Sequence, residues 1–273
     1  MDLLDEPTAK YGAVGWRDLS LALGDLTTDE CERLLAGSHP VVIVPIGSTE
    51  PHGPHLPLAT DAILAVESAR RAVRALREQE ICAIAAPPLA YGVTNYAAGF
   101  AGAISVSEAV VEALVRDVCV AYRQAGFSLV CVINHHLEPA HVGAISRGVD
   151  AARAASSGVV FANQLSPRWG RTLSAEFKRG DCHAGSYETS LVLAATRSLV
   201  HEEVSAKLAK VPISLSDAIR AGKSTFREMG IEHAYTGAPA EATVEEGNDL
   251  YAKLTAMVVG EVTEALAIVD KNP

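Results

Sequence analysis

Residues 41–61 read VVIVPIGSTEPHGPHLPLATD. Positions 41–46 are apolar and rich in β-branched residues, which predicts a strand buried on both faces, as in a parallel sheet. The residues behind this strand include Glu50, His52 and Asp61, side chains of the types that bind zinc, manganese or iron. Since open α/β sheets carry their sites at the carboxyl ends of their strands, this stretch predicts both a parallel sheet and a metal site at its edge.

The spacing of these side chains indicates two ions rather than one. Glu50 and His52 are two positions apart, so in an extended chain they point the same way and lie roughly 6.6 Å apart. Two ions about 3.5–4 Å apart, each bound at about 2 Å, could therefore be held one by each side chain. Asp61 follows a turn rich in glycine and proline and could bridge the pair.

A second apolar run, at 128–133, repeats the pattern. It leads into NHHLEP at 134–139, in which His136 and Glu138 are again two positions apart, in the reverse order. One histidine behind a strand is usually a polar loop residue, but two clusters with matching spacing are not explained in that way. Three carboxylates would leave one positive charge on two divalent ions, which suits a bridging hydroxide as nucleophile. The sequence therefore predicts a two-metal site whose ligands are Glu50, His52, Asp61, His136 and Glu138.

Strand and helix patterns alternate along the chain. Strands are expected at 41–46, 81–86, 128–133 and 159–162, and helices at 27–35, 61–77, 105–124, 139–155, 187–196 and from about 243. This alternation predicts an α/β fold, a mainly parallel β-sheet flanked by helices in three layers, α/β/α. No linker divides the chain, so a single domain over 1–273 is expected. The loop 91–105 has no period and is expected to be functional or covered by a partner.

Composition and charge argue against several classes of partner. The formal net charge of −10 disfavours nucleic acid and anionic membranes, both of which attract basic patches. No stretch approaches 18 consecutive apolar residues, so no membrane span is expected. The five scattered cysteines contain no C-x-x-C pair and fit a reducing compartment, the cytoplasm.

A third polar cluster surrounds His183, in a turn before an expected helix. Ser186 is a natural N-cap, and the partial positive charge of a helix N-terminus disfavours a charged imidazolium. His183 could therefore hold a pKa near the operating pH, as acid/base work needs, although alone it is more simply a surface residue. Glu188 either orients other residues of the site or is an ordinary acidic residue of a first helical turn.

Three further side chains are candidates for the wall of a substrate pocket. His135 lies beside the expected ligand His136, and Tyr96 lies in the loop without a period. Trp169 follows an expected strand and could stack on a planar substrate, although anchoring its loop in the core is an equal alternative. His141 falls on the helix after the second cluster and is expected to be an ordinary helix residue.

The sequence GSTEPHGPHLP at 47–57, followed by Thr60 and Asp61, resembles the signature of the creatininase (creatinine amidohydrolase) family. The resemblance covers most of the chain and includes NHHLE at 134–138, HAGSYETS at 183–190 and GAPAEATVEEG at 237–247. It implies a parallel sheet between helices, a hexamer of identical chains, and the five ligands named above, with Asp61 bridging both ions. It also implies that His183 is a catalytic acid/base.

Departures from the family pattern lie around the pocket rather than at the ligands. Many relatives carry NGHGGN where this chain has NHHLEP, at 134–139, and FPGT where it has FAGA, at 100–103. The resemblance therefore implies unchanged metal chemistry behind an altered substrate wall. Creatinine is not the expected substrate.

These inferences predict an enzyme, a metal-dependent amidohydrolase acting on C–N bonds other than ordinary peptide bonds. The leading hypothesis is cleavage of a small cyclic or formylated amide by attack of a metal-bound hydroxide, with His183 and Glu188 as catalytic residues. The substrate would lie against His135, Trp169 and Tyr96. The cofactors are two divalent ions, zinc first, with manganese or iron as alternatives, and the partners are a small-molecule substrate and copies of the same chain. The alternatives are a peptidase that trims a short peptide, a ring-opening hydrolase of a cyclic ketone, and a non-catalytic metal-binding scaffold.

Overall fold

The computed structural model describes residues 15–37 and 39–269 and contains, in that part of the chain, one parallel sheet of four strands. The strand order is β2-β1-β3-β4, so the two strands that precede the expected metal ligands, β1 and β3, lie side by side at the centre. The strands are β1 Val41–Ile46, β2 Ala83–Ala85, β3 Leu129–Asn134 and β4 Val159–Ala162. The expected fold class, a parallel sheet between helical layers, is confirmed.

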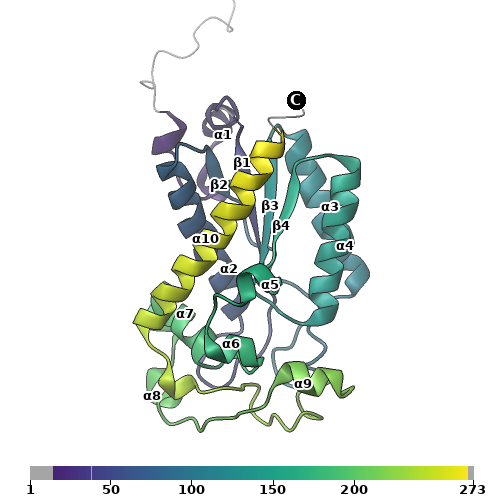
Figure 1. The fold of residues 1–273 in the computed structure, drawn as a ribbon, viewed down its shortest axis with the longest axis vertical. Coiled ribbons are helices and arrows are strands. Elements are labelled where there is room, and N and C mark those ends of the chain that lie inside the picture. Colours follow the sequence, from purple (N-terminus) through teal and green to yellow (C-terminus); the bar gives the residue numbers. More distant parts are fainter. Residues whose placement is uncertain (1–14, 38, 270–273) are drawn as a thin grey trace, which may run out of the picture.

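Helices cover both faces of this sheet (Figure 1). Because side chains alternate along a strand, β1 divides its residues between two cores. Val41 and Ile43 pack with one layer, formed by α2 Thr60–Glu78, α7 Ser186–Thr196 and α10 Val244–Val269. Val42 and Val44 pack with the other layer, formed by α3 Glu108–Gln124 and α4 Pro139–Ala155, and α1 Thr28–Leu35 packs at its margin.

One helix begins at the capping residue expected from the sequence, and two others do not. Thr27 and Glu30 form the expected capping box of α1. α3 begins later than expected, because Ser107, not Ser105, accepts the N–H of Val110. Ser186 does not cap α7; it is the first residue of the helix.

The remaining elements are short. They are η1 Trp16–Asp18, η2 Leu23–Asp25, α5 Pro167–Gly170, α6 Ala175–Arg179, η3 Arg197–Leu199, α8 Glu202–Ser205, α9 Leu215–Arg220 and η4 Pro239–Glu241. α6, α8 and α9 lie at the end of the molecule opposite α1 (Figure 1). There Phe226, Met229 and Ile231 form a small third core with Ala97. In the described residues, no helix is both long and apolar enough to cross a membrane.

Candidate metal centre

The carboxyl ends of β1 and β3 place the expected ligands together. The two strands pair in register up to Ile46 and Asn134, so the segments behind them start side by side. The chain after β1 carries Glu50 and His52 and then enters α2, whose first turn contains Asp61. Gly47 allows this return, because a Cβ there would lie 2.6 Å from the backbone of Asp61.

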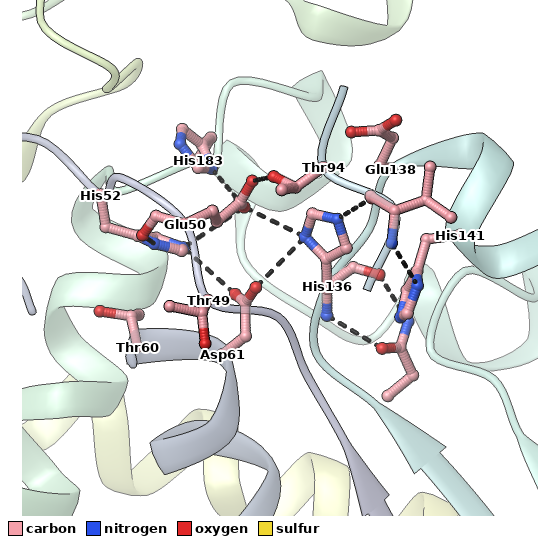
Figure 2. A network of polar contacts seen from close by, with 12 residues as sticks. Thr49, Glu50, His52, Thr60, Asp61, Thr94, His136, Glu138, His141 and His183 are labelled. Atoms are coloured by element: carbon pink, nitrogen blue, oxygen red, sulfur yellow. Dashed lines mark hydrogen bonds and ion pairs between the residues drawn. The ribbon is translucent and has the colours of Figure 1, made fainter. Parts of the chain in front are cut away.

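Glu50, Asp61 and His136 form a first group of donor atoms (Figure 2). The Nδ1 atom of His136 lies 3.0 Å from Oε1 of Glu50 and 3.2 Å from Oδ2 of Asp61. Its Nε2 donates to the carbonyl oxygen of Val93 at 2.6 Å. Because a carbonyl only accepts, the proton is on Nε2 and the Nδ1 lone pair faces the two carboxylates.

His52, Asp61 and Glu188 form a second group. The Nε2 atom of His52 lies 3.1 Å from Oδ1 of Asp61 and 3.4 Å from Oε2 of Glu188. Its Nδ1 donates to the carbonyl oxygen of Glu50 at 3.1 Å, which leaves the Nε2 lone pair facing inward. The two oxygens of Asp61 thus face different groups of donor atoms.

These residues fit divalent cations. The three carboxylates are buried, and within the described chain Nε2 of His52 and Oδ2 of Asp61 have no hydrogen-bond partner. Buried polar atoms are paired almost without exception in folded proteins, so two unpaired atoms within one buried cluster of carboxylates and histidines indicate that the cluster can hold cations. Mixed carboxylate and imidazole donors suit zinc, manganese and iron.

The electrostatics of the group show the same need for positive charge. Burial lowers the pKa of His52, but the Asp61 and Glu188 carboxylates outweigh it and raise that pKa to about 10. Burial raises the pKa of Glu50, but the neighbouring His136 outweighs it and brings that pKa to about 2. Burial raises the pKa of Glu188 to about 8. Without a cation, protons on the histidines would have to supply the positive charge that the carboxylates require.

The structure gathers four of the five expected ligands and brings in Glu188 rather than Glu138. Among the described residues, Glu138 belongs to no group of donor atoms that could hold an ion. Its carboxylate instead accepts the backbone N–H groups of Asn95 at 3.1 Å and Tyr96 at 3.2 Å. The reason is local: β3 ends at Asn134 and α4 starts one residue after Glu138, so the alternation of a strand does not continue that far.

Glu188 is held in the first turn of a helix that is buried over most of its length. Its Oε2 accepts the N–H of Ala184 at 2.6 Å, which turns the carboxylate back toward the site. The available signal in the sequence was a single acidic residue in an otherwise uncharged run, SYETSLVLAAT at 186–196. A solvated helix of that length would carry more charge, so the carboxylate had to be buried and needed a partner.

His183 lies beside both groups. Its Nδ1 is 3.8 Å from Oε1 of Glu50, and its Nε2 donates to the carbonyl oxygen of Pro51 at 3.1 Å. The ring lies between those of His52, at 4.6 Å between centroids, and Phe226, at 4.7 Å, and is tilted relative to both. Burial, with His52 beside it, lowers the pKa of His183 to about 4, so the ring is neutral near pH 7 with its Nδ1 lone pair facing the site.

A cavity of about 200 Å³ opens onto these groups. Its polar side is formed by the clustered residues and Glu138, and Tyr96 lies in its wall as expected. Six large apolar side chains of the wall were not predicted from the sequence, because most of them come from separate segments that carry no common motif. They are Leu137, Leu165, Phe177, Leu215, Ile219 and Phe226.

Two residues expected at the substrate lie elsewhere. His135 is buried behind the site, where its Nε2 lies 2.9 Å from the Ser68 hydroxyl, because its side chain leaves the strand end on the side opposite His136. Trp169 donates from Nε1 to Glu261 on α10 at 2.6 Å and is covered by the Arg168 guanidinium. The structure therefore corrects both assignments, and Trp169 fills the alternative role of anchoring its loop.

Comparison with known proteins places this geometry in a family. A sequence model of the family described as creatinine amidohydrolase matches residues 24–262. The mycofactocin precursor peptide peptidase of Mycobacterium tuberculosis is 32% identical over 244 residues, which cover 85% of this chain and 86% of that protein. The protein of the same name from Mycolicibacterium smegmatis is 30% identical over 228 residues, which cover 81% of this chain and 84% of that protein.

Solved structures of creatininases share the fold. The one described as "Creatininase Mn" aligns with a TM-score of 0.73 at 22% identity, over 90% of this chain and 98% of that chain. A crystal structure of creatinine amidohydrolase (creatininase) aligns with a TM-score of 0.72 at 21% identity, over 90% of this chain and 97% of that chain. At such identities the likeness establishes the fold but not the substrate.

Proposed function

The chain belongs to the creatininase family, and we propose that it is a metal-dependent hydrolase that cleaves an amide bond of a peptide. The observation that carries the proposal is the buried cluster of Glu50, His52, Asp61, His136 and Glu188, which forms two groups of donor atoms and contains two atoms without a hydrogen-bond partner. The relatives that are 30% and 32% identical are named as peptidases of a peptide precursor. Their names favour the peptidase alternative over the small cyclic or formylated amide that the sequence ranked first.

The two groups of donor atoms define two metal positions. We assign Glu50, Asp61 and His136 to one ion and His52, Asp61 and Glu188 to the other. Zinc is the first candidate, and manganese and iron suit the same donors. Bound there, two divalent ions supply polarisation of the amide carbonyl and a water of lowered pKa.

His183 is the proposed carrier of the proton. Its neutral ring has a lone pair on Nδ1, held toward the site because Nε2–H is donated to Pro51. It can take a proton at Nδ1 as the water attacks and return it to the departing nitrogen. Glu138, on the cavity wall, is a second proton-transfer candidate, because burial raises its pKa and two backbone N–H groups fix its orientation.

The shape of the cavity supports a short apolar part of a peptide as the substrate. Opposite the clustered residues, its wall consists largely of leucine, isoleucine and phenylalanine side chains. Among the described residues that line it there is no lysine or arginine. An anionic group beside the scissile bond would lose its hydration there without gaining a cationic side chain as partner, so a substrate group without negative charge is favoured.

A substrate panel tests this proposal. The protein would be loaded with zinc or manganese and incubated with short peptides rich in apolar residues, with matched peptides carrying aspartate or lysine, and with creatinine, other cyclic amides and formamides. We expect mass spectrometry to show cleavage of apolar peptides, lost on chelation and restored by the metal. Cleavage of a cyclic amide or formamide with all peptides intact would contradict the peptide proposal and support the substrate class that the sequence ranked first.

A further inference from the structure

One loop supplies hydrogen bonds to two of the proposed ligands. In the segment 93–96, the carbonyl oxygen of Val93 accepts the Nε2–H of His136 at 2.6 Å. The next residue, Thr94, donates its hydroxyl to Oε2 of Glu50 (Figure 2). The ligands of the first metal position are therefore oriented by a loop that carries no ligand itself.

This loop is held from behind by His141, on the first turn of α4. His141 is fully buried, and its Nδ1 accepts the N–H of Val93 at 3.3 Å. Its ring lies 4.8 Å from the ring of His136, centroid to centroid (Figure 2). Gly92 allows the contact, because a Cβ there would lie 2.7 Å from the His141 ring. Because a backbone N–H only donates, Nδ1 of His141 carries the lone pair in this contact.

We propose that His141 is a positioning residue of the metal centre, acting on His136 through Val93. By holding the N–H of Val93, His141 fixes the direction of the Val93 carbonyl. That carbonyl fixes the Nε2–H of His136, and the other ring nitrogen, Nδ1, then faces the carboxylates of Glu50 and Asp61, where an ion would be held. Partners behind a metal-ligating histidine set its tautomer and ring orientation and contribute about 10–100-fold to metal affinity. This role replaces the ordinary helix position expected from the sequence, and it rests on the metal centre proposed above.

Three variants separate positioning from packing. His141→Phe keeps a ring of similar size against Gly92 and His136 but removes the acceptor. His141→Asn keeps the acceptor, because the amide oxygen is bonded to Cγ just as Nδ1 is, while it loses the ring. Ile145→Val, one turn further along α4 and fully buried in the core, is the matched control for lost packing, because an isoleucine side chain accepts no hydrogen bond from Val93.

Metal dissociation constants of the metal-free variants would be measured by competition with a chelating dye, alongside their unfolding midpoints. We expect His141→Phe to weaken one of the two binding steps about tenfold, the step that involves His136, and to leave the other unchanged. His141→Asn should restore most of that affinity. Ile145→Val should lower the unfolding midpoint and leave both dissociation constants as in the wild type.

Two results would overturn the role of His141. One is a His141→Phe protein with both binding steps unchanged, and the other is equal weakening in the Phe and Asn variants, since the acceptor would then be irrelevant. If His141→Phe does not fold, His141→Ala against His141→Asn gives the same comparison. A wild-type protein that binds no divalent metal would instead contradict the proposed metal centre, so the two failures are distinguishable.

Discussion

At the scale of single residues, the site is defined by which atoms are left without partners. Nε2 of His52 and Oδ2 of Asp61 are buried and have no hydrogen-bond partner in the described chain. The other ring nitrogen of His52, Nδ1, donates to a backbone carbonyl, and so does Nε2 of His136. The two histidines are therefore fixed in the tautomer that ligates a cation. Single substitutions that keep the fold can test each assignment.

Glu188→Gln should remove one of the two bound ions, whereas Glu138→Gln should retain both. Glutamine keeps an oxygen for the N–H of Ala184 but lacks the charge that a divalent ion needs. Elemental analysis of the two purified variants would show the difference. Retention of both ions in Glu188→Gln with loss in Glu138→Gln would favour the assignment by family resemblance over the geometry.

His183→Ala should lower kcat by about 10²–10⁴ while metal content stays at the wild-type level, as for a lost acid/base group. Steady-state kinetics on a cleaved peptide and metal analysis of the same preparation provide the two numbers. Since His183 also belongs to a group of possible donors with Glu50 and His52, loss of an ion from this variant would make His183 a ligand instead.

His55 predicts a measurable pH dependence. Burial, with His52 nearby, lowers the pKa of His55 to about 4 from an ordinary value of 6.5. Between these values the unfolded chain binds one more proton than the folded chain, so this residue makes stability fall as pH falls from about 6.5 to about 4, at ~1.4 kcal/mol per pH unit. His55→Gln can keep the Thr189 hydrogen bond and removes the titration. Denaturant unfolding near pH 5 should therefore show a shallower slope for the variant, and equal slopes would contradict a neutral buried His55.

At the scale of elements, the sequence predicted those strands and helix ends that depend only on residues close together in the chain. β1 and β3 are continuous apolar runs, and the α1 cap lies within four residues, so local pattern was sufficient. The start of α7 depends on Glu176, which lies eleven residues before Tyr187 and accepts its N–H at 2.9 Å. Glu188, carried by that helix, and the wall residues around Phe226 come together only through tertiary packing, which no spacing in the chain reveals.

Glu176→Ala tests whether this remote cap positions the site. The same carboxylate accepts the N–H of Ala238 at 2.9 Å, so its loss leaves two buried donors without a partner. We expect the free energy of unfolding to fall by ~3 kcal/mol, and metal affinity to fall with it because α7 carries Glu188. Glu241→Ala, at an exposed position, is the control. A Glu176→Ala protein that is destabilised but binds metal as tightly as the wild type would contradict a role of this cap in positioning the metal centre.

At the scale of the whole molecule, the donor atoms lie at the ends of the central strands, and segments outside the sheet form much of the cavity wall. The central strands β1 and β3 end where the donor atoms meet, and the segment containing α9 and Phe226 closes the cavity above them. The apolar wall therefore comes largely from segments other than those that carry the donor atoms. That residues 1–273 form one domain, and that copies of the chain assemble, remain predictions.

The most direct test of the central claim is the metal content of the wild type and of Asp61→Ala, measured by elemental analysis after loading and desalting. Asp61 is the only residue shared by the two groups assigned to the ions, with one oxygen facing each. The wild type should hold two divalent ions per chain, and Asp61→Ala should hold neither. Asp150→Ala, at an exposed position on α4, should match the wild type. One full equivalent of metal in Asp61→Ala would contradict a bridged two-metal centre.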